Sequence, residues 1–155
     1  MYGDKGLAGG MSWYKSADHK PSVVFRPYEP PAQEPSAEFP FWFCTGRLLE
    51  HWHTGTMTRR VEELDRALPE ALLSMNAEDA AALGVNDGDM VQLTSPHGTM
   101  QIKVSLAGRV EPPSGMVFAP FFAAETLINR VVQDYYCPLS KETDYKKTCV
   151  SIKKA

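Results

Sequence analysis

The chain has 155 residues, the length of one domain with an added arm, and its apolar fraction of 43% permits a sizeable core. Its formal net charge of −3, from 16 basic and 19 acidic residues, argues against a general nucleic-acid-binding protein. Apolar runs fall short of the roughly 20 residues that a membrane span needs. Residues 1–10 hold glycines where a signal peptide has its apolar core, so we expect neither membrane insertion nor a signal.

The first forty residues predict an arm rather than a folded body. Residues 1–20 are polar and rich in glycine, and residues 23–25 are typical of a short strand. The proline-rich stretch from Pro27 to Pro40 must run extended, because proline interrupts helices. We therefore assign residues 1–40 to a flexible segment and linker arm, and residues 41–155 to one domain.

Short strands dominate the rest of the chain. Residues 41–45 begin with four apolar residues in succession, which predicts a strand buried on both faces. Turn-forming glycines and prolines separate the remaining strand candidates, which are residues 72–75, 90–94, 100–106, 116–119 and 148–152. The sequence predicts a mainly β fold, best described as a compact β-barrel with short helices.

Three short helices complete the expected elements. Residues 58–68 have apolar positions at helical spacing and stop at Pro69. Asn76 is suited to cap a second helix that Gly84 ends, and residues 123–133 are the third candidate. The Gly88-Asp89 pair that follows the second helix reads as an architectural turn.

The run from residue 45 to residue 55 concentrates polar chemistry. It contains two Thr-Gly pairs, Arg47 and two histidines, and Arg59 and Arg60 follow it. Glycine lets a backbone approach a ligand closely, and arginine, hydroxyls and imidazoles supply donors suited to phosphate. The segment predicts a binding loop for a large anionic ligand, although a solvated charged face would have the same composition.

Metal binding by this loop is disfavoured. His51 and His53 would point the same way on a strand, but other histidines and cysteines are distant in sequence, so hydrogen bonding to a ligand or to the backbone is the better interpretation. The cysteines Cys44, Cys137 and Cys149 form no C-x-x-C pair, and they allow one disulfide without requiring it. Neither a catalytic residue nor a metal ligand is assigned.

Several motifs together resemble the cofactor-binding domain of molybdopterin oxidoreductases, in particular the catalytic subunits of periplasmic nitrate reductases. The run TGRLLEHWHTG with MTRR after it carries the resemblance. LGV with GD, PFF with Asn129, and PLSKETDYKK agree in order and spacing. The arm motif RPYEP also fits, so the resemblance covers about residues 20–155.

The resemblance implies a fold and a set of site residues. The expected fold is a six-stranded double-psi β-barrel that closes over a molybdenum bis(molybdopterin guanine dinucleotide) cofactor. Phe121 would line the substrate side. The residues implied to contact the cofactor are Thr45, Gly46, Arg47, Leu48, Leu49, Glu50, His51, Trp52, His53, Thr54, Asn129 and Lys146.

The implied activity is the reduction of nitrate to nitrite, in nitrate assimilation or respiration with electron transport. The chain lacks the family's cysteine quartet for a 4Fe–4S cluster and the segment that supplies a cysteine ligand to molybdenum. We therefore expect this chain to be inactive alone, whether it is an excised domain or a subunit. Its partners would be the remaining domains or a large subunit, which would hold the cluster, and a cytochrome-type electron donor.

The implied location is the periplasm, or the cytoplasm for an assimilatory homologue. One alternative is the same domain in another molybdenum or tungsten oxidoreductase, such as formate dehydrogenase. The other is a non-catalytic double-psi-barrel interaction module, which would have no need of Arg47, Asn129 or Lys146.

Overall fold

The computed structural model describes Phe25, residues 27–138 and residues 140–155. These residues fall into two units that divide after Pro30. In the first unit Phe25 and residues 27–30 are exposed and without regular structure, and the strand expected at residues 23–25 falls largely outside the described residues. The second unit begins at Pro31, so the last part of the expected arm belongs to it.

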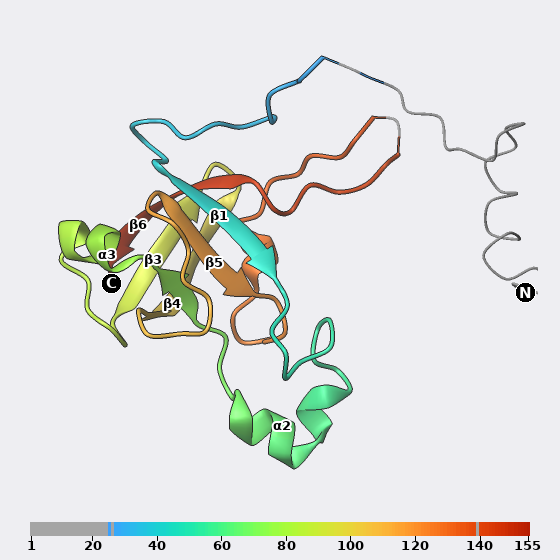
Figure 1. The fold of residues 1–155 in the computed structure, drawn as a ribbon, viewed down its shortest axis with the longest axis vertical. Helices are drawn as coiled ribbons and strands as arrows, with labels where there is room; N and C mark the ends of the chain where they lie inside the picture. Colours follow the sequence, from blue (N-terminus) through green and yellow to red (C-terminus); the bar gives the residue numbers. More distant parts are fainter. Residues whose placement is uncertain (1–24, 26, 139) are drawn as a thin grey trace, which may run out of the picture. The chain divides into compact units, whose positions relative to one another are not determined.

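Six strands of the described chain close into a barrel in the order β1-β5-β2-β4-β3-β6 (Figure 1). Their bounds are β1 Phe41–Gly46, β2 Leu73–Met75, β3 Met90–Ser95, β4 Gly98–Ser105, β5 Met116–Pro120 and β6 Thr148–Lys154. The pairs β1–β5 and β2–β4 are parallel, and the other pairs with assigned register are antiparallel. When the six strands are counted in a circle, so that β1 follows β6, a shift by three turns the pair β1–β5 into the pair β4–β2. The six-stranded double-psi barrel predicted from the resemblance is confirmed.

The core fills the barrel, as strand periodicity requires. In β1 Phe41, Phe43 and Thr45 point inward and are buried, whereas Trp42 and Cys44 are half-buried on the outer face. The strand is therefore not buried on both faces as its composition suggested. The largest fully buried apolar side chains of the barrel are Phe43, Leu73, Val91, Leu93, Ile102, Val104, Val117 and Val150.

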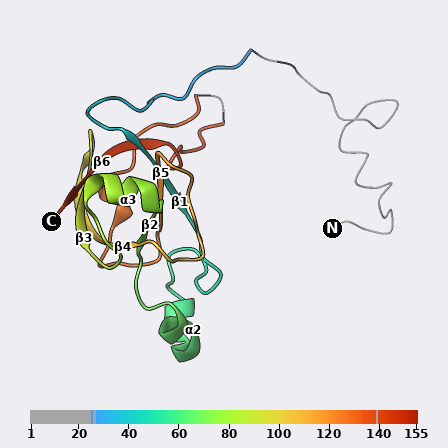
Figure 2. The same ribbon diagram turned by 60° about the vertical axis from the view of Figure 1, so that its left-hand side comes forward.

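Two short helices lie outside the barrel (Figure 2). Helix α3, Ala77–Leu83, begins as predicted, because the Asn76 side chain accepts a hydrogen bond from the backbone N–H of Glu78 at 2.9 Å, and it ends at Gly84. Helix α2, Glu62–Ala67, belongs to a lobe of residues 47–71 that projects from the barrel. A 3₁₀ turn, η2 at Thr58–Arg60, precedes α2, because Val61 is extended and divides the single helix expected at residues 58–68.

The prediction of a helix at residues 123–133 is wrong. Only a 3₁₀ turn, η3 at Ile128–Arg130, forms there. Val131, Val132 and Gln133 are buried in succession, which one face of a helix cannot provide. Gly98 of β4 lies against the backbone carbonyl of Arg130, so this segment packs directly on the barrel.

Candidate functional site

The loop that follows β1 has two faces. The side chains of Leu48, Glu50 and His51 are half-buried or buried, whereas Leu49 is 91% exposed and Trp52 is 57% exposed. Arg47, His53 and Thr54 are also exposed. The predicted cofactor residues therefore divide into a set that supports the loop and a set that faces outward.

His51 holds the loop from inside. Its Nε2–H donates to the backbone carbonyl of Leu68 at 2.8 Å, and its Nδ1 lies 3.1 Å from the hydroxyl of Thr58. The same hydroxyl accepts from the backbone N–H of Trp52 at 3.2 Å, and the His51 ring packs on Phe122 with centroids 4.2 Å apart. Since both ring nitrogens have protein partners, His51 fixes the loop rather than offering its side chain to a ligand.

The outward face presents a cation over an aromatic group. The guanidinium of Arg47 lies 5.3 Å from the ring centroid of Trp52, and its Nη2 is 3.0 Å from Nε2 of His53. His53 itself has a positive φ of 52°, a backbone conformation that few non-glycine residues adopt. The three side chains form one exposed, donor-rich surface at the tip of the loop.

A segment a hundred residues downstream meets the beginning of this loop. The Thr45 hydroxyl donates to the backbone carbonyl of Tyr145 at 3.0 Å, and the ammonium of Lys146 donates to the backbone carbonyl of Thr45. The ammonium of Lys146 is also 6.0 Å from the ring centroid of Phe121, at the end of β5. The structure thus brings together Thr45, Phe121 and Lys146 of the predicted site.

The glycines at the two ends of the loop have different constraints. A Cβ on Gly46 would lie 2.5 Å from Cε2 of the half-buried Phe118, so a larger residue there would have to displace that ring. Gly55 has a φ of 73°, and a Cβ on it would lie 2.9 Å from the Arg59 side chain. Gly55 therefore sets the path of the loop at its end, whereas Gly46 leaves room for the Phe118 ring.

Arg59 follows the loop in sequence, but its side chain forms ion pairs within the protein. Its Nε donates to Asp65 at 2.9 Å and its Nη1 pairs with Glu125 at 3.2 Å. The hydrogen bond to Asp65 is the main cause that raises the pKa of Arg59 above its ordinary value. This guanidinium ties α2 to the segment after β5, so it is occupied, whereas Arg60 is exposed.

Asn129 stands apart from the other predicted residues. It is exposed on η3, and among the described residues no hydrogen bond or ion pair links it to Thr45, Phe121 or Lys146.

The sequence analysis did not identify Gln133, whose side chain is 1% exposed. Its backbone N–H donates to the Thr148 hydroxyl at 2.8 Å, and its Nε2–H donates to the Asp144 carbonyl at 2.7 Å. Gln133 thereby anchors both ends of the segment that carries Lys146. A lone glutamine gives no sequence signal for this role.

The described residues hold no group of three or more His, Cys, Asp or Glu side chains placed to bind a metal ion. Cys44 and Cys149 are not joined by a disulfide. Among these described residues, no helix is long and apolar enough to cross a membrane.

Two solved structures are similar to this chain. Among solved structures, acetylene hydratase from Pelobacter acetylenicus is similar over 76% of this chain at a TM-score of 0.65 and 15% identity, which is a likeness of fold. The match covers 18% of that chain, so the present chain spans about a fifth of its neighbour. The rationally designed protein mkDPBB_sym_86 matches over 78% of this chain and 98% of its own, at a TM-score of 0.40 and 15% identity.

The family model described as "Molydopterin dinucleotide binding domain" matches residues 41–150. That range contains the barrel up to β6, the two-faced loop and the segment of Lys146. The chain belongs to the family of molybdopterin dinucleotide-binding domains.

Proposed function

We propose that this chain is the cofactor-binding domain of a molybdenum nitrate reductase, and that it clamps a bis(molybdopterin guanine dinucleotide) cofactor with the outward face of its loop. The observation that carries the proposal is the position of Lys146, which donates to the backbone carbonyl of Thr45 and lies 6.0 Å from the ring centroid of Phe121, although the three residues are far apart in sequence. Family membership supports the cofactor class, and the loop motif supports nitrate as the substrate.

The donor set fits the phosphates of such a cofactor. Arg47 and Lys146 supply two cations, and the exposed backbone and hydroxyl of Thr54 add neutral donors. Carboxylates face inward instead, since Glu50 pairs with Arg109 and its side chain is only 10% exposed. An anion approaching the outward face therefore meets positive charge and hydrogen-bond donors.

The bound cofactor would supply the two-electron redox chemistry at molybdenum. The residues of this chain would bind and orient it: Arg47 and Lys146 as cationic donors, and Phe121 as an apolar wall on the substrate side. His51 and Gln133 would act indirectly by fixing the two segments that meet there. Nitrate reduction itself would require the larger enzyme, with its iron–sulfur cluster and electron donor.

A titration of the full chain tests the cofactor clamp. GDP and inorganic pyrophosphate should shift the amide resonances of residues 45–54 and 144–147, and they should alter Trp52 fluorescence. Lys146→Gln and Arg47→Gln should each weaken pyrophosphate binding about tenfold, because each removes one charge-assisted contact of about 1.4 kcal/mol. Lys153→Gln, at an exposed site on β6, is the matched control and should leave binding unchanged.

The choice of substrate needs the assembled enzyme. With this domain in place, the enzyme should reduce nitrate and not oxidise formate, and Phe121→Ala should alter KM for nitrate more than cofactor content. Formate oxidation would support the same domain in another molybdenum or tungsten enzyme. Equal pyrophosphate binding by all three lysine and arginine variants would instead support an interaction module.

A further inference from the structure

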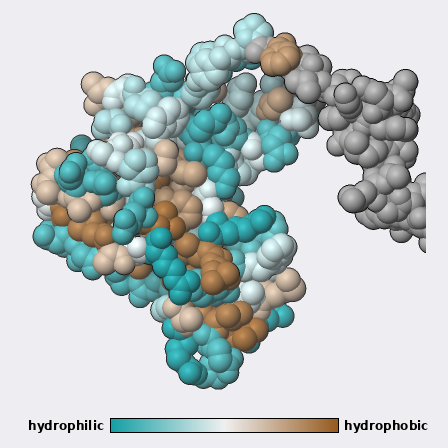
Figure 3. All heavy atoms as spheres, in the orientation of Figure 1, coloured by the Kyte–Doolittle hydropathy of each residue, from teal (hydrophilic) through white to brown (hydrophobic). Residues whose placement is uncertain are grey.

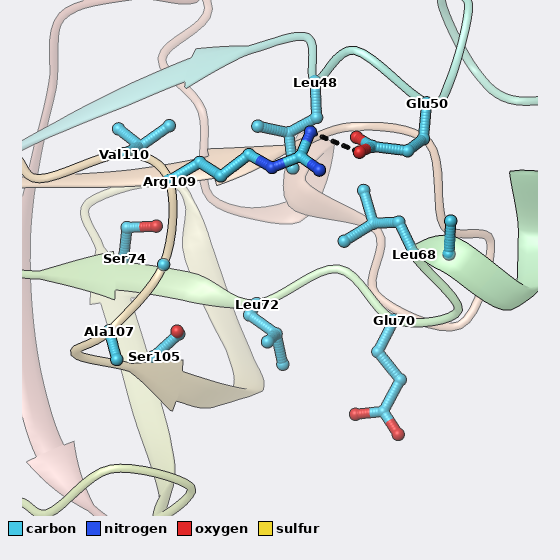
Figure 4. A pocket seen from close by; sticks show the side chains of 12 residues that line it. Leu48, Glu50, Leu68, Glu70, Leu72, Ser74, Ser105, Ala107, Arg109 and Val110 are labelled. Carbon is cyan, nitrogen blue, oxygen red and sulfur yellow. Dashed lines mark ion pairs between the residues drawn. The ribbon is translucent and has the colours of Figure 1, made fainter.

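A cavity of about 240 Å³ lies beneath the loop, where the lobe meets the barrel (Figure 4). Figure 3 shows apolar surface gathered at this junction. Among the residues that line the cavity are Leu48, Glu50, Leu68, Ser74, Ser105 and Arg109. Leu48 and Glu50 come from the inward face of the loop, so the cavity and the outward clamp share one backbone segment.

Two hydroxyls lie side by side in the wall of this cavity. Ser74 of β2 and Ser105 of β4 are partners in the parallel pair, and both side chains are directed toward the cavity (Figure 4). Ser74 is 8% exposed, and neither hydroxyl has a hydrogen-bond partner within the part of the chain that the structure describes. Ser105 is half-buried, and neither side-chain oxygen is sealed away from the open cavity, so both hydroxyls are free to bond to an incoming group. A ligand with a hydrogen-bonding group would satisfy both.

The charges at the rim are already paired. Glu50 pairs with Arg109, and Glu70 pairs with Lys103 at 2.6 Å. A ligand ion of either sign would therefore find no unpaired opposite charge at the rim. The cavity is thus unsuited to the phosphates that the outward face of the loop attracts, and it favours an uncharged molecule.

We propose that this cavity is a second binding site, for a small uncharged molecule with an apolar body and one hydroxyl or carbonyl group. The apolar body would lie between Leu48 and Leu68, and its polar group would bond to Ser74 and Ser105. An apolar cavity of about 150 Å³ accommodates benzene, so this one has room for a ring with a polar substituent. Because Leu48 and Glu50 form part of the wall, the bound molecule restrains the cofactor loop from its inward side.

Benzyl alcohol is a suitable probe for the full chain, with toluene and benzoate as matched compounds. Benzyl alcohol should bind with a Kd on the order of 1 mM and shift the methyl resonances of Leu48, Leu68, Leu72 and Val110. Toluene should bind about fivefold more weakly, because it lacks the hydrogen bond, and benzoate should not bind. No nucleotide is present, so the result is independent of the proposed cofactor clamp.

Substitutions locate the site. Ser74→Ala should remove the preference for benzyl alcohol over toluene, and Ser105→Leu should abolish binding of both by filling the cavity. Ser151→Ala, a half-buried serine on β6, should change neither. Equal binding of toluene and benzyl alcohol to the unmodified chain overturns the proposal. So do shifts confined to the exposed Leu49 and Trp52, or binding that survives Ser105→Leu. Should Ser105→Leu fail to fold, the Ser74→Ala comparison still decides the matter.

Discussion

Two polar, glycine-containing segments leave the barrel, and they are held in opposite ways. The turn between α3 and β3 is held by its own carboxylates: Asp89 accepts from the backbone N–H of Asn86 at 2.8 Å and from Lys154 of β6 at 2.6 Å, and Asp87 accepts from the backbone N–H of Leu106 at 2.7 Å. The loop after β1 is met at its start, at Thr45, by Tyr145 and Lys146, which are a hundred residues away. A turn fixed to the barrel by its own side chains serves the architecture. A loop held from a distance can bring ligand-binding groups of separate segments together.

The largest test of this contrast is His51→Ala. The change removes hydrogen bonds to Leu68 and Thr58 and leaves a cavity beside Phe122, so it should cost about 2–4 kcal/mol of unfolding free energy. Urea denaturation measures that difference. His53→Ala, at an exposed position, should stay within about 0.5 kcal/mol. Equal losses for the two histidines would contradict the two-faced description of the loop.

Thr45→Val probes the distant contact with less disruption. It keeps the shape of the buried side chain and removes the hydrogen bond to Tyr145, which should cost about 1 kcal/mol. Hydrogen exchange should show faster exchange of the amides of residues 145–147. Thr99→Val changes an exposed threonine on β4 and should leave that exchange unaltered. Unchanged exchange in Thr45→Val would mean that other contacts, such as that of Gln133, hold the segment.

The sequence predicted what depends on neighbours along the chain. Short apolar runs bounded by turn-forming residues located the strands, and Asn76 and Gly84 marked the ends of α3. Contacts across long separations had no local signal, so the partnership of Gln133 with Asp144 and Thr148 went unnoticed. The helix expected at residues 123–133 failed for a similar reason, because the barrel buries Val131, Val132 and Gln133 together.

The family resemblance identified the residues of the loop, but it did not separate those that support the loop from those that face outward. It grouped Leu48, Glu50 and His51 with Arg47 and His53, although the fold turns the first three inward. Which way a loop residue faces depends on the lobe that packs beneath it, through contacts such as that of His51 with Leu68. The sequence pattern does not show which distant residues make these contacts.

The smallest effect is expected at the turn between α3 and β3, where Asp89→Asn tests a charge. The hydrogen bond from Lys154, at 2.6 Å, is the main cause that lowers the pKa of Asp89, and the backbone N–H of Asn86 contributes next. Because the folded pKa is lowered, the contribution to stability is complete above the ordinary pKa of about 3.9 and is lost as pH falls through the folded value. Unmodified chain and variant should therefore differ in urea midpoint at pH 7, and the difference should shrink as pH falls below about 3.9. Asp134→Asn, an exposed carboxylate without an ion pair among the described residues, is the control, and a difference that does not shrink on acidification would mean that the turn depends on shape rather than charge.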